Sequence, residues 1–473
     1  MLIQKKAAKP LPHSQCKVKH FLPHRKKPNI LHSQGIKNGN FYTIILGFTI
    51  AFRNFTAIRT YIINQAIENK KKLNIMAKNK YLKIMMKNFR LSIPTRLVFG
   101  VGELKRLAKQ PLPGKKALIV ISAGTSMKNF GYLDTVVNQL KEAGVDSVVF
   151  DKIKPNPCKA HVTEGAELCK AEGCDFVLGL GGGSSIDTAK AIAVVVAMGG
   201  DLWDYVSGGH GKSQPVTKAL PIVAIPTTAG TGTEIDPWGV ITDEELNEKI
   251  GFGFPQTFPV LSIVDPETMV SVPAKLTAYQ GFDAFFHAAE GYINSKHASS
   301  ISDLYALEAI RLLAKYLPKV VADGRDVHAR AKVAWGSTLA GMVESTSGCT
   351  GEHALEHALS AFYPKLPHGA GLIAISKAYY KTFKNDCMKR YMKMAEKMTQ
   401  QKAARPSDFL DALATMQRLC GVDNIKLSDY GITPADFDKF VENAVDTGAM
   451  MLDGDPRFLT KEDIYKIYQD SYK

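Results

Sequence analysis

Between residues 116 and 266, short apolar runs alternate with longer segments of helical periodicity. The runs "KALIVIS" (Lys116–Ser122) and "FVLGLGGG" (Phe176–Gly183) are apolar at most positions, which is typical of strands buried on both faces of a parallel sheet. Such alternation predicts an α/β domain in which helices connect parallel strands. The other predicted strands are Ser147–Asp151, Pro221–Thr228 and Leu261–Pro266.

After Pro266 the pattern becomes helical throughout. Segments such as "PAKLTAYQGFDAFFHAAEGYIN" and "SISDLYALEAIRLLAKYLPKVV" place apolar residues at i, i+3 and i+4, and strand-like runs no longer occur. We therefore predict an α/β domain at residues 86–266 and an all-helical domain at residues 267–473.

The first 85 residues differ from the rest in charge. They hold 17 of the 60 Lys and Arg residues but only one acidic residue, Glu68, so the remainder is nearly neutral although the chain carries +15. A neutral body argues against nucleic-acid binding, because neutralisation of phosphates dominates that affinity. We expect residues 1–85 to be disordered, a targeting leader, or absent from a native protein that begins at Met85 or Met86.

Cysteine usage and hydropathy indicate a cytoplasmic protein with no membrane partner. The longest apolar run in the basic segment, "FYTIILGFTIAF", is shorter than the about 20 residues that a membrane helix needs. The cysteines are odd in number, irregularly spaced and free of C-x-x-C motifs, so we expect neither disulfides nor a zinc-thiolate site. They are Cys16, Cys158, Cys169, Cys174, Cys349, Cys387 and Cys420.

Two loops at predicted strand ends are suited to binding a dinucleotide. Gly181–Ser184 joins a strand to a helix, where glycines let a phosphate approach the backbone and the first N–H groups of the helix stabilise an anion. "PTTAGTGTE" (Pro226–Glu234) follows another strand and is rich in hydroxyl groups. The glycine loop matches neither G-x-G-x-x-G nor the P-loop. A turn without a ligand remains an alternative, with Asp187 and Lys190 on a solvated helix face.

Histidines and acids of metal-ligand type occur in two segments. Asp283 and His287 are four residues apart in "GFDAFFHAAEGYI", so they share a helix face. His353 and His357 have the same spacing in "GEHALEHALSAFYPKLPHG", and His368 follows. One carboxylate and three imidazoles suit Fe(II) or Zn(II). Spacing alone does not show that the two segments meet, and a satisfied core Asp and His remain an alternative.

The second segment also matches an inverted zinc-protease motif, His353-x-x-Glu356-His357. In a protease the two histidines would bind zinc and Glu356 would be the base. That hypothesis leaves both strand-end loops and the Asp283/His287 pair without a role.

Taken together, five segments closely resemble the iron-containing, or group III, alcohol dehydrogenase family. They are "GGGSSIDTAKAIA", "IPTTAGTGTE", "VDPETMVSVP", "GFDAFFHAAEGYI" and "HALEHALSAFYPKLPHGAGLI", and the resemblance covers residues 88–473. It implies a Rossmann-like NAD(P)-binding α/β domain followed by an all-α domain, the dehydroquinate synthase-like fold, with a metal in the cleft. It implies hydride transfer between NAD(P) and a primary alcohol or diol, or the matching aldehyde, by a homodimer. A glycerol dehydrogenase-like polyol oxidoreductase is the alternative.

The resemblance also implies roles for individual residues. Fe(II), or alternatively Zn(II), would be held by Asp283, His287, His353 and His368, and His357 would be a catalytic proton relay near the nicotinamide. Glu356 would be a structural carboxylate. The expected cofactor contacts are Asn156, Gly181, Gly182, Gly183, Ser184, Asp187, Thr227, Thr228, Thr231 and Lys249.

Two departures from the family pattern bear on the site. His353 and His368 are fifteen residues apart, whereas close relatives have fourteen, so we expect the loop "YPKLP" to absorb one extra residue. The first strand of the domain ends at Ser122 where NAD-preferring members carry an Asp, and Lys128 lies near. We therefore predict that NADP is accepted as well as NAD.

Overall fold

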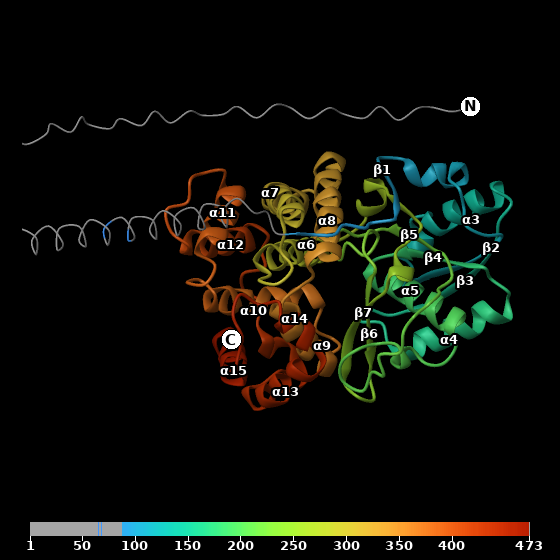
Figure 1. Cartoon of the computed structure of the whole chain (residues 1–473). Coiled ribbons are helices and arrows are strands. Elements are labelled where there is room, and N and C mark those ends of the chain that lie inside the picture. Colours follow the sequence, from blue (N-terminus) through green and yellow to red (C-terminus); the bar gives the residue numbers. More distant parts are fainter. Residues whose placement is uncertain (1–64, 66–67, 69–87, 473) are drawn as a thin grey trace, which may run out of the picture. The chain divides into compact units, whose positions relative to one another are not determined.

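The computed structural model describes residues 65, 68 and 88–472. The chain forms two compact units, Met1–Met85 and Met86–Lys473. The predictions made for residues 1–85 lie outside the described residues, apart from Gln65 and Glu68, which are both helical. The fold that follows is that of the second unit (Figure 1).

A six-stranded parallel sheet forms the N-terminal half of this unit, with strand order β1-β8-β5-β4-β2-β3. The apolar runs predict five of these strands to within two residues at each end. Strand β1 is not predicted, because its four residues are too few and too exposed to give a strand pattern. The strands are β1 (Arg96–Phe99), β2 (Lys116–Ser122), β3 (Asp146–Ile153), β4 (Phe176–Gly181), β5 (Ile222–Pro226) and β8 (Leu261–Val264).

Helices cover both faces of this sheet, as Figure 1 shows. Successive strand residues point to opposite faces, so Ile119 of β2 packs with η1 and α3, whereas Val120 packs with α4 and α5. Both faces are therefore apolar, which explains the continuous apolar runs. These helices are α2 (Ser126–Asn129), α3 (Tyr132–Glu142), α4 (Lys159–Ala171), α5 (Gly183–Met198) and the 3-10 helices η1 (Glu103–Lys109) and η2 (Leu202–Asp204).

An antiparallel hairpin, β6 (Trp238–Asp243) and β7 (Glu248–Gly253), lies between β5 and β8 in the chain. This hairpin is not predicted from the sequence, because "EKIGFG" has two glycines and two charged residues in six positions. Strand β7 contacts helices α9 and α13 of the C-terminal half. The hairpin therefore connects the two halves of the unit.

The rest of the described chain is helical, as predicted, and encloses one large apolar core that includes Phe282, Phe285 and Phe286. The 3-10 helices here and before β8 are η3 (Pro255–Thr257), η4 (Pro266–Met269), η5 (Leu427–Tyr430) and η6 (Pro434–Asp436). The α-helices are α6 (Ala274–Ile293), α7 (Ser300–Ala322), α8 (Val327–Ser347), α9 (Gly351–Phe362), α10 (His368–Thr382), α11 (Met388–Thr399), α12 (Ser407–Leu419), α13 (Phe437–Thr447), α14 (Ala449–Leu452) and α15 (Lys461–Ser471).

The composition predicts that the chain has neither disulfides nor a membrane-spanning helix. The six cysteines that the structure describes are free, and five of them are buried. Among the described residues, no helix has both the length and the apolar character needed to cross a bilayer.

Candidate active site

Helix α6 carries Asp283 and His287 one turn apart on a buried surface. Phe285 and Phe286, between them, are fully buried in the helical core and fix the position of the helix. Asp283 and His287 are themselves only 4% and 5% exposed. Polar groups at that depth are unfavourable unless partners satisfy them, so the contacts of these two side chains decide their role.

The two histidine-containing segments of the sequence meet at Asp283. Oδ1 of Asp283 lies 3.4 Å from Nε2 of both His353 and His368, and 3.7 Å from Nε2 of His287. The rings of His287 and His353 are stacked, with centroids 4.4 Å apart. The structure thus brings the four residues predicted as ligands into one cluster, although 70 residues separate Asp283 from His353.

Buried glutamates contact the outer nitrogens of two of these rings. Nδ1 of His353 lies within hydrogen-bond distance of Oε2 of Glu290, and Nδ1 of His368 lies within hydrogen-bond distance of Oε2 of Glu356. Both glutamates are fully buried. A carboxylate at Nδ1 favours the tautomer with a free Nε2, the form that binds a metal. Glu290 is not among the predicted site residues, although it lies one turn after His287.

The ionisation of His287 and Asp283 suits a divalent metal. Burial lowers the pKa of His287 to about 3, so its imidazole is neutral and able to act as a ligand. Burial opposes ionisation of Asp283, but His287 and His368 beside it bring the pKa of its carboxyl well below the usual range. A carboxylate with three imidazoles therefore fits Fe(II) or Zn(II).

Two further side chains that the sequence analysis missed approach this cluster from the end of α8 and the turn after it. The donor atoms of Cys349, His287 and His353 lie within 4.8 Å of one another. Oε2 of Glu344 lies 3.8 Å from Nε2 of His287, and Sγ of Cys349 lies 3.7 Å from Oε1 of Glu344. Cys349 is four residues before His353, a spacing that could have indicated it, whereas Glu344 has no helical spacing to a predicted ligand.

His357 lies beside the cluster and one turn beyond His353 on α9. Its ring centroid is 5.5 Å from that of His368 and 6.2 Å from that of His353. Its Nδ1 has no hydrogen-bond partner among the described residues. Burial, followed by the positive charge of Lys249, lowers the pKa of His357 well below the usual value, so the ring is neutral.

The two strand-end loops face each other at the carboxyl ends of β4 and β5. A Cβ at Gly182 would lie 3.2 Å from Oγ1 of Thr228, and a Cβ at Gly183 would lie 2.5 Å from Cγ2 of Thr231. Gly181 has φ 149°, which other residues rarely adopt. No side chain caps the start of α5, which leaves this helix N-terminus open to an anion.

Thr227 and Ser184 complete these loops. The N–H of Thr227, at the end of β5, donates to the carbonyl of Gly181 at 2.8 Å, which ties one loop to the other. Ser184 is partly exposed in the first turn of α5. All of the glycines and threonines predicted to contact the cofactor therefore lie in these two loops.

Asp187 and Lys190 are buried, so the alternative of a solvated helix face is wrong. Oδ1 of Asp187 accepts from Oγ1 of Thr233 at 2.8 Å, and Oδ2 accepts from the N–H of Val240 at 3.2 Å. Nζ of Lys190 donates to Oγ1 of Thr233 at 2.6 Å and pairs with Oδ1 of Asp236 at 3.1 Å. Both side chains therefore hold the threonine loop in place.

Asn156 and Lys249 lie where the two halves of the unit meet. Nζ of Lys249, on β7, lies 3.3 Å from Oε2 of Glu356 and 3.4 Å from Nδ1 of His368. Nδ2 of Asn156 donates to the carbonyl of Pro364 at 3.1 Å. Their protein contacts are therefore with α9 and with the loop before α10.

These contacts also remove the structural basis for a protease. Its base would have to reach a water molecule, but Glu356 is fully buried and its Oε2 is engaged by His368 and Lys249. The three residues of the motif, His353, Glu356 and His357, thus contact different partners.

Family models match almost all of the second unit. Residues 94–266 match "Iron-containing alcohol dehydrogenase", and residues 277–472 match "Fe-containing alcohol dehydrogenase family, C-terminal". The chain belongs to the iron-containing alcohol dehydrogenase family. This family member is therefore an oxidoreductase that acts on alcohols, and the predicted fold of a Rossmann-like domain followed by an all-helical domain is confirmed.

Curated relatives of this family member act on small alcohols, according to their names. A probable NADH-dependent butanol dehydrogenase of Bacillus subtilis is 32% identical, over 82% of this chain and 100% of the relative. An NAD-dependent methanol dehydrogenase of Bacillus methanolicus is 40% identical, over 59% and 71%. A choline dehydrogenase of Bacillus subtilis is 39% identical, over 63% and 74%.

Solved structures of similar proteins have the same fold. An archaeal halo-thermophilic alcohol dehydrogenase from a Red Sea brine pool matches this family member with TM-score 0.78 and 33% identity, over 82% of this chain and 100% of that chain. An NADH-dependent butanol dehydrogenase from Thermotoga maritima matches with TM-score 0.74 and 32% identity, over 82% and 99%.

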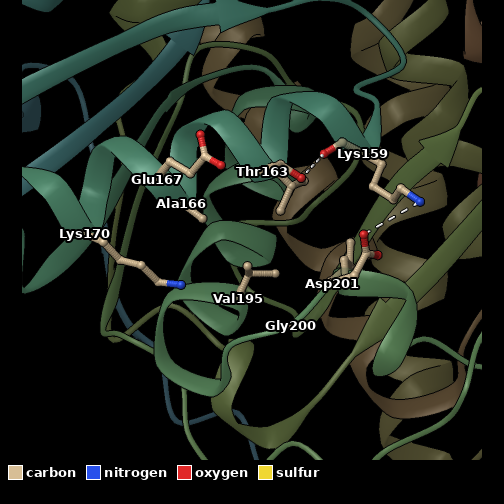
Figure 2. Close-up of a pocket in the computed structure, with 10 residues that line it drawn as sticks. Lys159, Thr163, Ala166, Glu167, Lys170, Val195, Gly200 and Asp201 are labelled. Carbon is tan, nitrogen blue, oxygen red and sulfur yellow. Dashed lines mark hydrogen bonds and ion pairs between the residues drawn. The ribbon is translucent and has the colours of Figure 1, made fainter.

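A separate small pocket of about 130 Å³ lies between α4, the end of α5 and η2 (Figure 2). Lys159 and Asp201 face each other across it at 3.7 Å, and Nζ of Lys159 also pairs with Asp243 at 2.6 Å. None of the predicted site residues lines this pocket. Lys159 is already paired with the two carboxylates of Asp201 and Asp243, and we assign the pocket no function.

Proposed function

We propose that this chain oxidises a primary alcohol or diol, and reduces the matching aldehyde, with NAD as hydride carrier. Fe(II), or Zn(II) as the alternative, is held by Asp283, His287, His353 and His368. The observation that carries the proposal is the convergence of three histidine Nε2 atoms on Oδ1 of Asp283. A divalent ion bound there supplies Lewis acidity toward the alcohol oxygen.

His357 handles the proton that leaves the alcohol in this proposal. Its imidazole is neutral, it lies beside the ligands, and its Nδ1 has no hydrogen-bond partner among the described residues. A neutral imidazole takes up a proton from a hydroxyl group and returns it in the reverse direction. The proton is held at Nδ1 of His357.

The dinucleotide occupies the crevice at the carboxyl ends of β4 and β5 in this proposal. Its pyrophosphate lies on Gly181–Ser184 at the uncapped start of α5, opposite Thr227, Thr228 and Thr231. Asp187 holds the second loop in place through its hydrogen bond with Thr233. Asn156 and Lys249 face the nicotinamide end, next to His368. The names of two relatives, NAD-dependent and NADH-dependent, support NAD.

NADP is also accepted in this proposal. Strand β2 ends at Ser122, so the last residue of this strand is not an Asp that would repel a 2′-phosphate. Lys128 lies on α2, just after that strand end, and pairs with Asp151 at 2.6 Å.

The decisive experiment measures metal and turnover together. Protein purified without oxygen is analysed for bound iron and zinc, and NADH or NADPH formation is followed with methanol, butan-1-ol, propane-1,3-diol and choline, which relatives' names suggest. We expect about one metal ion per chain and turnover of at least one alcohol that stops on chelation and returns with Fe(II). Metal-independent turnover, or none with the whole panel, contradicts the proposal.

A homodimer in the cytoplasm completes the proposal. Strand β1 is an edge strand that pairs with β8 on one side, and Phe89 and Leu91 just before it are 46% and 44% exposed. An apolar segment beside an open strand edge favours pairing with a second copy. Free cysteines support a reducing compartment. Light scattering on the purified protein and cell fractionation test these two points.

A further inference from the structure

The carboxylate of Glu356 contacts two nitrogen groups, an imidazole and an ammonium group. Its Oε2 is within hydrogen-bond distance of Nδ1 of His368 and lies 3.3 Å from Nζ of Lys249. Nζ of Lys249 also donates to Oγ of Ser360 at 2.8 Å. Glu356 is fully buried and Lys249 is 5% exposed, so water contributes little to this network.

The network joins residues from both halves of the unit. Glu356 and Ser360 lie on α9 and His368 begins α10, whereas Lys249 lies on β7 in the N-terminal half. Oδ1 of Asn156, also from that half, lies 3.4 Å from Nζ of Lys249. The imidazole of His368 is thus oriented by a carboxylate that itself depends on a cation from the other half.

We propose that Glu356 and Lys249 are a positioning pair, which makes the orientation of His368 depend on contact between the two halves. A buried carboxylate or ammonium group is stable only while its partner remains. When β7 moves away from α9, Glu356 loses its cation and holds the His368 ring differently. The inference rests on the proposed function, because it requires His368 to bind the metal through Nε2.

The first test compares two glutamines on the same helix. Glu356→Gln is expected to weaken metal binding by about 10- to 100-fold, as loss of a carboxylate behind a ligand histidine generally does. The matched control is Glu352→Gln, because Glu352 is equally buried on α9 but contacts neither His368 nor Lys249. The readouts are competition with a chelator and the visible absorption of the Co(II)-loaded protein.

The second test is a double-mutant cycle with Lys249→Met. If the pair acts through His368, the change in metal affinity that Lys249→Met causes in the wild type is largely absent when residue 356 is Gln. Additive changes overturn the inference, as does a Glu356→Gln protein with wild-type affinity and cobalt spectrum. If Glu356→Gln does not fold, a cobalt spectrum unchanged by Lys249→Met alone overturns it.

The proposed function fails separately. If the wild-type holoenzyme binds no divalent metal, or turns over without it, the proposed function is wrong regardless of the variants. If the wild type binds metal and oxidises alcohols while the variants behave as the control does, only the positioning pair is wrong.

Discussion

Oε1 of Glu290 accepts the backbone N–H of His353 at 3.1 Å, while Oε2 of the same carboxylate contacts Nδ1 of the His353 ring. Oε1 also accepts from the N–H of Thr350 at 3.2 Å and from its hydroxyl at 3.1 Å. Thr350 is the N-cap residue of α9 but makes no capping bond of its own. Helix α6 therefore both caps α9 and orients the ring of His353, which we propose as a metal ligand.

Glu290→Gln is expected to lower metal affinity by about 10- to 100-fold and the free energy of unfolding by about 1–3 kcal/mol, since one amide cannot serve all these donors. Chelator competition and urea unfolding of the metal-free protein measure the two effects. Glu308→Gln, on the surface of α7 with its partner Arg311, is the control. Unchanged metal affinity would show that Glu290 does not orient His353.

His368→Ala and His357→Ala separate a ligand from a proton carrier. His368→Ala removes an Nε2 that faces Asp283, so metal and activity are expected to be lost together. His357→Ala is expected to retain the metal and to lower kcat by about 100- to 10,000-fold, the usual contribution of a general acid–base group. Metal analysis and steady-state kinetics of both variants distinguish the two roles. A metal-free His357→Ala protein would make His357 a ligand.

Gly183→Ala is expected to impair dinucleotide binding without affecting the metal. The added Cβ would lie 2.5 Å from Cγ2 of Thr231, which forces the two loops apart. The expected result is a KM for NAD raised by roughly tenfold or more, from a loss of at least about 1.4 kcal/mol of binding free energy. Gly251→Ala on β7 is the control, because its Cβ would meet no atom within 4 Å. Equal KM values in both variants would argue against the glycine loop as the phosphate site.

Asp151→Asn is expected to shift cofactor preference toward NADP. Lys128 and Asp151 are about half exposed and pair at 2.6 Å, so the carboxylate offsets the lysine charge near the end of β2. Removing it leaves an ammonium group for a 2′-phosphate, and we expect a several-fold rise in the ratio of kcat/KM for NADP over NAD. Glu164→Gln, which breaks a similar pair with Lys152, serves as control. An unchanged ratio would mean that the 2′-phosphate does not reach Lys128.

Asp455 gives the stability a dependence on pH. Burial raises the pKa of its carboxyl to about 7 from the ordinary 3.8, so the folded protein binds this proton more tightly than the unfolded chain does. The free energy of unfolding therefore falls as pH rises from about 4 to 7, by at most a few kcal/mol at about 1.4 kcal/mol per pKa unit. Asp455→Asn retains an acceptor for Gly351 and Tyr379 and is expected to flatten this dependence. Urea unfolding of both proteins at pH 5 and pH 8 measures this dependence. An equal change in the free energy of unfolding between the two pH values in both proteins would contradict the prediction.

The sequence predicts much of this fold because central strands such as β2 and β4 are buried on both faces, and because helices such as α3 bury one face. The i, i+4 spacing of Asp283 and His287 likewise predicts a shared face. That these residues meet His353 depends on how α6 packs against α9, which spacing does not encode. Lys190 appears as a surface residue in a linear pattern but is fully buried against Asp236.

Residues that position other side chains were the hardest to predict from the sequence. Glu290 and Glu344 lie on helices whose other faces are apolar, and an acidic residue there does not reveal its partner. The hairpin β6–β7 was not predicted because glycines and charged residues interrupt its strands, although it carries Lys249. Composition and periodicity describe burial, whereas these roles depend on pairing between distant elements.

Asn156 binds the loop before α10 through main-chain carbonyls, those of Pro364 and Leu366, and not through any side chain of that loop. Pro364 and Lys365 are themselves exposed. Substitutions at these two positions therefore leave the anchoring bonds intact, whereas a change in loop length displaces both carbonyls. In directed evolution, Pro364 and Lys365 are accordingly positions at which libraries can be diversified while His368 keeps its position.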